Sequence, residues 1–166
     1  MSDKFLKGYE KLTSPIIGMP CCRVAVGEHK SFSVGFGASV KNTGKLPGPR
    51  FYGEYEMGTY SAFWRIEKQK ETIFCKSDDF GQLDVRDSLS NMLSGLTFSH
   101  LEVEARAKLI LYLSGDRRLI FDGTSCDRED EIFHIFLPNS EYLEYSWERG
   151  WRVGPAKGPW RGGMAV

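Results

Sequence analysis

Cysteine is scarce in this chain, and its spacing matches no metal-binding or redox motif. The sequence contains four cysteines, at Cys21, Cys22, Cys75 and Cys126. No two of them form a C-x-x-C pair, and two adjacent cysteines cannot easily bind one tetrahedral metal. We therefore expect free, partly buried thiols in a reducing compartment, and neither a metal nor a cofactor.

Long apolar runs and an excess of one charge are missing as well. No run of 18 apolar residues occurs, and residues 1–10 contain no apolar core of signal-peptide length. Lys and Arg together number 22, as do Asp and Glu, so the formal net charge is zero. Proteins that bind nucleic acid usually carry excess positive charge, which neutralises phosphates. These absences predict a soluble cytoplasmic protein whose partner is neither a membrane nor a nucleic acid.

Residue patterns typical of metalloenzymes and nucleotide-binding enzymes are also absent. The three histidines, His29, His100 and His134, form no H-E-x-x-H pair. Gly35-Phe36-Gly37 lacks the third glycine of a dinucleotide-binding loop, and no G-x-x-x-x-G-K-[ST] motif occurs. His134 falls in an alternating apolar stretch, which favours a half-buried, hydrogen-bonded histidine on a strand.

One cysteine and one histidine have side chains of the kind used in nucleophilic catalysis. Cys126 can act as a nucleophile and His134 as its base, with Asp122 or Asp127 orienting the imidazole. Residues 124–128 lack the signatures that surround the thiol of cysteine proteases. We therefore favour a structural role for Cys126 and predict no catalytic residue.

The composition indicates one globular domain rich in β-sheet. The chain has 166 residues, of which 41% are hydrophobic and 13% are aromatic. This length suits a single domain, and the aromatic share favours strands over helices. We assign residues 1–153 to this domain and residues 154–166, which are rich in Gly and lack periodicity, to a loosely ordered tail.

Hydrophobic periodicity predicts two helices and many strands. A short amphipathic helix is expected over residues 4–12, and a second helix where apolar residues recur at helical spacing over residues 89–96. Residues 38–50, which contain Pro47-Gly48-Pro49, are expected to form a surface loop. Strands are predicted over residues 22–26, 31–37, 51–56, 59–68, 71–76, 97–104, 107–114, 118–122, 131–137 and 141–147.

The order of these elements indicates the fold class. Strands, one central helix and further strands follow one another without the β-α-β alternation of a parallel sheet. The sequence therefore predicts an α+β fold of mainly antiparallel sheet, with one central helix and a short N-terminal helix. Residues 51–56 and 59–68 are expected to pair as an aromatic hairpin, with Gly58 at the turn. The aromatic side chains of this segment can fill a core, line a ligand pocket or anchor an interface.

Acidic side chains occur on predicted loops and at strand positions that we expect to face solvent. They do not follow the D-x-[DN]-x-[DN]-G register of a calcium-binding loop. Exposed carboxylates can instead pair with lysines and arginines of a partner protein and speed its association. The candidate partner-binding residues are Glu54, Glu56, Asp78, Asp79, Asp127, Glu129 and Asp130.

Four segments resemble a group of bacterial proteins. They are GEYEMGTY at residues 53–60, FWRI at 63–66, LIFDG at 119–123 and GWRVG at 150–154. Over residues 30–154 the chain resembles small immunity proteins that are encoded beside polymorphic or contact-dependent toxins. This resemblance implies stoichiometric, non-catalytic binding of a cognate toxin domain in the cytoplasm, and it carries over no active-site residue.

Three functional hypotheses remain open. The leading one is an immunity protein that binds and neutralises a bacterial toxin domain. The alternative is a β-rich domain that binds a small molecule, in which the aromatic residues line a cavity instead of filling a core. The third is a hydrolase that uses Cys126 and His134.

Overall fold

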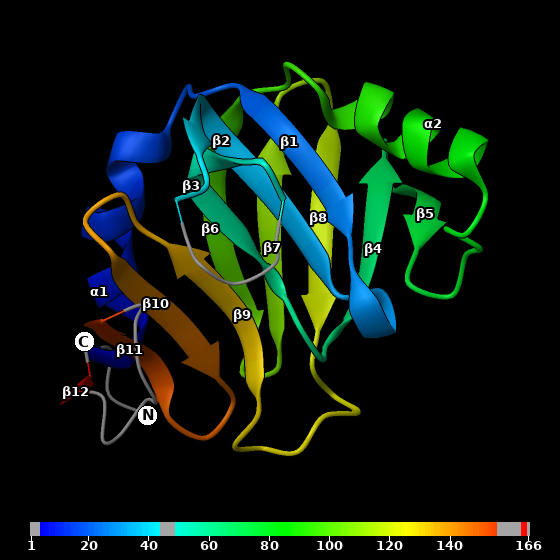
Figure 1. The fold of residues 1–166 in the computed structure, drawn as a ribbon. Coiled ribbons are helices and arrows are strands. Elements are labelled where there is room, and N and C mark those ends of the chain that lie inside the picture. Colours follow the sequence, from blue (N-terminus) through cyan, green and yellow to red (C-terminus); the bar gives the residue numbers. More distant parts are fainter. Residues whose placement is uncertain (1–3, 44–48, 156–163, 166) are drawn as a thin grey trace.

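The protein consists of two antiparallel sheets whose inner faces pack against each other (Figure 1). The computed structural model describes residues 4–43, 49–155 and 164–165, and gives the side chains of residues 9–43 and 49–155. The seven-stranded sheet has the order β1-β2-β3-β9-β10-β11-β12, and the five-stranded sheet has the order β5-β4-β8-β7-β6. The predicted α+β class with mainly antiparallel sheet is confirmed.

Most elements lie close to their predicted ranges, whereas the strands at residues 150–155 and 164–165 were not predicted. The strands of the larger sheet are β1 (Cys21–Val26), β2 (Phe32–Lys41), β3 (Phe51–Thr59), β9 (Glu131–Phe136), β10 (Glu141–Ser146), β11 (Gly150–Pro155) and β12 (Met164–Ala165). Those of the smaller sheet are β4 (Phe63–Lys68), β5 (Glu71–Cys75), β6 (Phe98–Ala105), β7 (Lys108–Leu113) and β8 (Arg117–Asp122). The helices are α1 (Lys4–Thr13) and α2 (Leu83–Leu93), with short 3-10 turns at Ser14–Ile16 and Glu28–Lys30.

Aromatic side chains from both sheets fill the space between them. The ring of Phe32 on β2 lies 4.6 Å from that of Trp64 on β4, and the ring of Phe121 on β8 lies 4.9 Å from that of Phe133 on β9. These residues alternate along their strands with outward-facing ones, as one buried sheet face requires. The inward positions therefore form one continuous core, and the outward positions are left to form surfaces.

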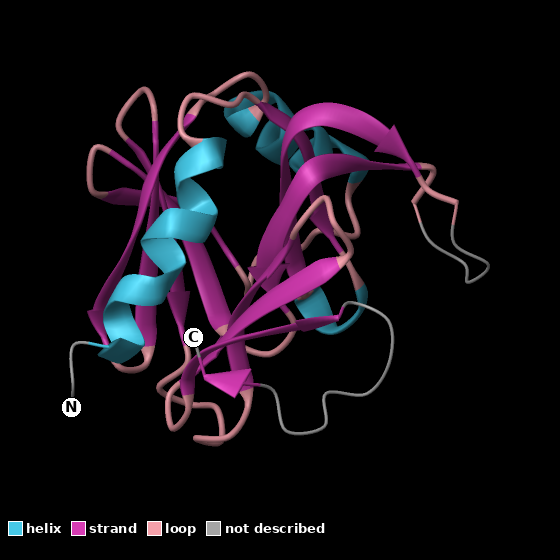
Figure 2. Cartoon of the chain, turned by 90° about the vertical axis from the view of Figure 1, so that its left-hand side faces the viewer, coloured by secondary structure: helices cyan, strands magenta, loops and turns pink. Residues whose placement is uncertain are grey.

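The two helices lie at the open sides of this sandwich. Helix α1 contacts β11 of the larger sheet and β6 of the smaller one, and Figure 2 shows it lying along the opening between the sheets. Helix α2 contacts β1 at the opposite side, beside β4 and β5 (Figure 1). Neither helix in the described part of the chain is long and apolar enough to cross a membrane.

The structure contradicts the predicted aromatic hairpin. Strand β3 pairs with β2 and β9, whereas β4 pairs with β5 and β8, so the two strands belong to different sheets. The chain passes between the sheets at residues 60–62, where the N–H of Ala62 donates to Oγ1 of Thr59 at 3.0 Å. Gly58 lies inside β3 rather than at a turn, and a Cβ there would lie 1.9 Å from the carbonyl oxygen of Phe32.

Two further boundaries differ from the prediction. Strand β2 continues to Lys41, which pairs with Phe51. Part of the predicted loop is therefore a two-stranded segment, the paired arm of β2 and β3, formed by residues 39–41 and 51–53. Residues 44–48 lie outside the described residues. Strand β11 spans the predicted domain boundary at residue 153, because its pairing with β10 continues to Pro155. Of the predicted tail, residues 156–163 and 166 lie outside the described residues.

Candidate functional site

The candidate site is a hollow on the outer face of the seven-stranded sheet, where small side chains leave space. Ala25, Ser33 and Gly53 line it from β1, β2 and β3. In the strand register, Ala25 pairs with Ser33, Ser33 with Gly58, and Gly58 with His134, so one row of residues crosses four strands. Because every position of this row before His134 is small, the sheet surface is open there.

Larger residues form the walls of this hollow. The paired arm of β2 and β3 contributes Val40 and Tyr52 on one side, together with Pro49 just before β3, and Tyr60 and Phe136 contribute to the other wall. The volume of the hollow is about 620 Å³. Small-molecule sites typically occupy roughly 300–1,000 Å³ and combine apolar walls with a few polar groups. The hollow therefore has the size and lining of a ligand pocket.

A buried carboxylate holds an arginine at one end of the hollow. Glu56 is only 4% exposed; its Oε1 accepts from the N–H of Gly53 at 2.6 Å, and its Oε2 accepts from Oγ of Ser33 at 2.7 Å and from Nη1 of Arg23 at 3.0 Å. The guanidinium of Arg23 also lies over the ring of Tyr52, 5.4 Å from its centroid. The Arg23 side chain is therefore fixed before any ligand arrives.

A second carboxylate holds a histidine in the opposite wall. His134 is 4% exposed, and its Nδ1 lies 2.5 Å from Oε1 of Glu131. The hydroxyl of Tyr142 donates to the other oxygen of Glu131. Burial, and next the charge of Glu131, raise the pKa of Tyr142, which keeps this hydroxyl protonated. Among residues 9–43 and 49–155 only Nδ1 of His134 has a hydrogen-bond partner, so Nε2 remains available to a ligand.

Of the predicted partner-binding residues, only Glu54 and Glu56 lie at this site. The expectation that Glu56 is exposed is wrong, because Arg23 and Ser33 on the neighbouring strands cover and bind its carboxylate. Glu54 is half-buried and lines the hollow; its Oε2 accepts from the N–H of Ala38 at 3.4 Å.

The other predicted residues lie on two separate loops. Asp78 and Asp79 lie between β5 and α2, where Asp78 accepts from the N–H of Cys75 at 2.8 Å. Asp127, Glu129 and Asp130 lie between β8 and β9 and are exposed. Figure 1 shows these two loops well apart, so the structure does not gather the acidic residues into one surface.

The cysteine–histidine arrangement of the third hypothesis does not form. The partner of His134 is Glu131, not Asp122 or Asp127, and no hydrogen bond or ring contact of His134 within the described residues involves Cys126. All four cysteines are free, as predicted. In the part of the chain that the structure describes, no group of three or more His, Cys, Asp or Glu side chains is placed to hold a metal ion.

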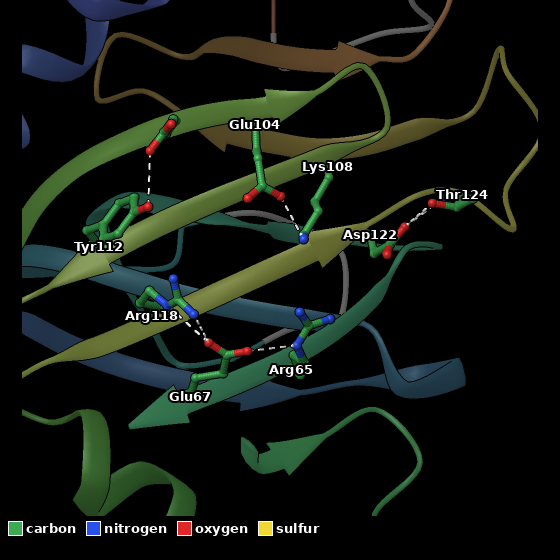
Figure 3. Close-up of polar contacts among 9 residues, drawn as sticks. Arg65, Glu67, Glu104, Lys108, Tyr112, Arg118, Asp122 and Thr124 are labelled. Carbon is green, nitrogen blue, oxygen red and sulfur yellow. Dashed lines mark hydrogen bonds and ion pairs between the residues drawn. The ribbon is translucent and has the colours of Figure 1, made fainter. Parts of the chain in front are cut away.

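The outer face of the five-stranded sheet carries charges that pair with one another (Figure 3). Glu67 accepts from Nε of Arg65 at 3.1 Å and from Nε of Arg118 at 3.0 Å, and Nζ of Lys108 lies 2.6 Å from Glu104. Because these groups satisfy one another, this face offers a ligand less uncompensated charge than the hollow does.

Sequence reasoning missed most of the hollow. Tyr52 and Tyr60 belong to the aromatic segments for which the sequence allows a role in a ligand pocket, whereas no motif in the sequence points to Arg23 or Ser33. One signal was present: Ser33 and Gly35 alternate with the apolar residues of β2, which marks an outward face of small side chains.

Comparisons with protein-family models, with curated proteins and with solved structures found no match to this chain.

Proposed function

We propose that this protein binds a small organic molecule in the hollow and does not transform it. The observation that carries this proposal is the hollow of about 620 Å³ on the outer face of the seven-stranded sheet. Its apolar walls favour burial of a hydrocarbon or ring, and its few polar groups favour one orientation of the ligand. The function is thus a binding function that the rigid sheet supports.

Preorganised polar groups support tight binding. Arg23 is held by Glu56, and His134 is held by Glu131 and stacked against Tyr60 at 4.6 Å between ring centroids. Ordering flexible side chains costs free energy during association, and groups that are already fixed avoid most of this cost. The polar groups of the hollow can therefore contact a ligand at little entropic cost.

The absence of turnover is part of the same proposal. Within residues 9–43 and 49–155, no hydrogen bond joins His134 to a serine, threonine or cysteine that would serve as a nucleophile. The hydroxyl of Ser33 donates to Glu56, and that of Thr59 accepts from Ala62. A base without an adjacent nucleophile suits ligand orientation better than covalent catalysis.

The proposal can be tested by filling the hollow. We expect a fragment screen by ligand-observed NMR to find molecules that bind the native protein, and Ala25→Leu to weaken them at least about tenfold, because the added side chain occupies their space. The matched control is Ala105→Leu, at an exposed position on the other sheet. Circular dichroism verifies that both variants fold. Fragments that bind native protein and Ala25→Leu equally would show that the hollow is not their site.

Exposed carboxylates favour a second candidate function, the neutralisation of a toxin domain in the cytoplasm. Asp127, Glu129 and Asp130 are exposed on one loop and can attract a basic partner. We expect the protein to form a complex with a toxin encoded beside it, and the triple change Asp127→Asn, Glu129→Gln and Asp130→Asn to slow association, measured by surface plasmon resonance. An unchanged association rate at low salt would remove these residues from the interface.

A further inference from the structure

We propose, on the basis of the binding function above, that the ligand of the hollow carries a positive charge on an organic ammonium group. The hollow joins an uncompensated carboxylate to aromatic walls, and this combination selects for charge as well as for shape.

The charges that line the hollow leave one carboxylate without a cation. Arg23 and Glu56 neutralise each other across 3.0 Å. Glu54 lines the same hollow, is half-buried, and makes no ion pair with any residue from 9 to 43 or from 49 to 155. Partial burial lowers the local dielectric constant, so this charge attracts a cation more strongly than a fully exposed carboxylate does.

A second carboxylate adds negative potential at the opposite wall. Glu131 lies directly beside His134, and both of its oxygens accept hydrogen bonds from uncharged or titratable donors, His134 and Tyr142, instead of from a lysine or arginine. An anionic ligand would therefore face Glu54 and Glu56 in the lining and Glu131 behind His134, while the guanidinium of Arg23 in the lining is already paired. A cationic ligand meets an attractive field from both walls.

Aromatic rings in the walls provide the contacts that an ammonium group prefers. Tyr60 is 56% exposed although one face of its ring stacks on His134, and Tyr52 and Phe136 also line the hollow. The face of an aromatic ring is negative and attracts cations within about 6 Å of its centroid. The guanidinium of Arg23 already lies over the ring of Tyr52, 5.4 Å from its centroid, so Tyr60 and Phe136 are the aromatic residues of the lining that remain for a ligand.

Three probes of matched shape separate charge from size. They are choline, its uncharged analogue 3,3-dimethylbutan-1-ol, and the anion 3,3-dimethylbutanoate. We expect choline to shift the backbone resonances of Ser33, Gly53 and Tyr60 in ¹⁵N-labelled protein, and to bind at least about fivefold more tightly than the alcohol. The anion is expected to bind most weakly.

Two isosteric variants identify the carboxylate responsible. Glu54→Gln should weaken choline severalfold and leave the alcohol unchanged, whereas Glu71→Gln, at an exposed position on β5, should affect neither. Equal or tighter binding of the alcohol or the anion overturns the inference of positive charge but leaves the hollow a binding site. The same holds if only uncharged or anionic fragments bind there. If no fragment of any charge binds the hollow, the proposed function fails, and this inference with it.

Discussion

Buried carboxylates on the outward faces of both sheets are each bound by an arginine. Glu56 and Glu144 on the larger sheet and Glu67 on the smaller one are almost fully covered, and each is paired with at least one guanidinium. An ionised carboxylate without such partners would be costly to bury. These pairs therefore explain how charged residues can occupy the centres of two outer sheet faces.

The pair at Glu67 predicts a stability that depends on pH. Burial raises the pKa of Glu67, but hydrogen bonds from Arg118 and Arg65 outweigh it and hold the pKa below its usual value. The ionised form therefore stabilises the fold at neutral pH, and this contribution is lost as the pH falls through the lowered pKa. We expect Glu67→Gln to reduce the free energy of unfolding by about 1–2 kcal/mol at pH 7.

Urea unfolding from pH 7 to pH 3 measures this effect. The difference between native protein and Glu67→Gln should shrink below pH 4, because protonated Glu67 and glutamine are then both uncharged. Glu71→Gln, at an exposed position, serves as the control. A difference of the same size at pH 3 and pH 7 would contradict the role given to the two arginines.

Burial also predicts that one cysteine is chemically inert. Cys21 is buried, and this burial raises the pKa of its thiol to about 12. Because only the thiolate reacts, we expect iodoacetamide at pH 8 to modify Cys75 and Cys126, which are partly exposed, well before Cys21. Peptide mass spectrometry measures the order. All four cysteines should react in urea, and labelling of Cys21 in the folded protein at the rate of Cys75 would refute the prediction.

At the scale of elements, the paired arm of β2 and β3 and the helix α2 have different roles. The arm supplies one wall of the hollow. Strands β2 and β3 approach each other so closely at Gly53 that only glycine fits there, because a Cβ on Gly53 would lie 2.7 Å from Cα of Gly35. Helix α2 lies outside the site and contacts β1, the edge strand of the larger sheet. The helix therefore covers an edge that would otherwise be open to pairing with another chain.

The packing of α2 predicts an asymmetric mutational response. Leu89 and Leu93 are buried in the core, whereas Leu83 at the start of the helix is 73% exposed. We expect Leu89→Ala or Leu93→Ala to lower the free energy of unfolding by about 2–4 kcal/mol, because each leaves a cavity. Leu83→Ala should change it by less than about 0.5 kcal/mol. Denaturant unfolding measures all three; equal effects would show that α2 does not pack as described.

At the scale of the whole molecule, stability depends on closing the sandwich at its open sides. Tyr9 on α1 connects the two sheets: its ring stacks on Trp151 of β11 with centroids 5.0 Å apart, and its hydroxyl donates to the carbonyl oxygen of Leu101 on β6 at 3.3 Å. A single buried side chain thus contacts strands that belong to different sheets. The hollow lies on the outer face of the larger sheet, whereas Tyr9 contacts this sheet from the side of the core. The geometry of the hollow therefore depends on a sheet that Tyr9 helps to hold in place.

Removing this connection should destabilise the fold as a unit. We expect Tyr9→Ala to lower the free energy of unfolding by about 3 kcal/mol, and Tyr9→Phe, which retains the ring, to lower it by about 1 kcal/mol. Thermal unfolding followed by circular dichroism and by tryptophan fluorescence tests this. If Tyr9→Ala unfolds α1 alone while the sheets keep their native transition, α1 is not part of the cooperative unit.

Local patterns in the sequence determined the class of the fold and the character of most elements. Phe32, Val34 and Phe36 alternate along the strand predicted over residues 31–37, and all three are buried. The apolar stripe of α2 was visible because Leu89 and Leu93 recur at helical spacing. Such periodicities depend only on neighbours along the chain, which is why they can be recognised without a structure.

Only the tertiary structure decided which strands are partners, and therefore where the site lies. Strands β3 and β4 are adjacent in sequence but belong to different sheets. Arg23 binds Glu56 although the two residues are 33 positions apart in the sequence. Alternation shows that a residue faces outward but does not show what lies opposite, because strand pairing is a long-range property of the whole chain. The hollow combines several such pairings, so the local pattern indicates small outward-facing residues such as Ser33 and Gly35 but does not show that they form a hollow.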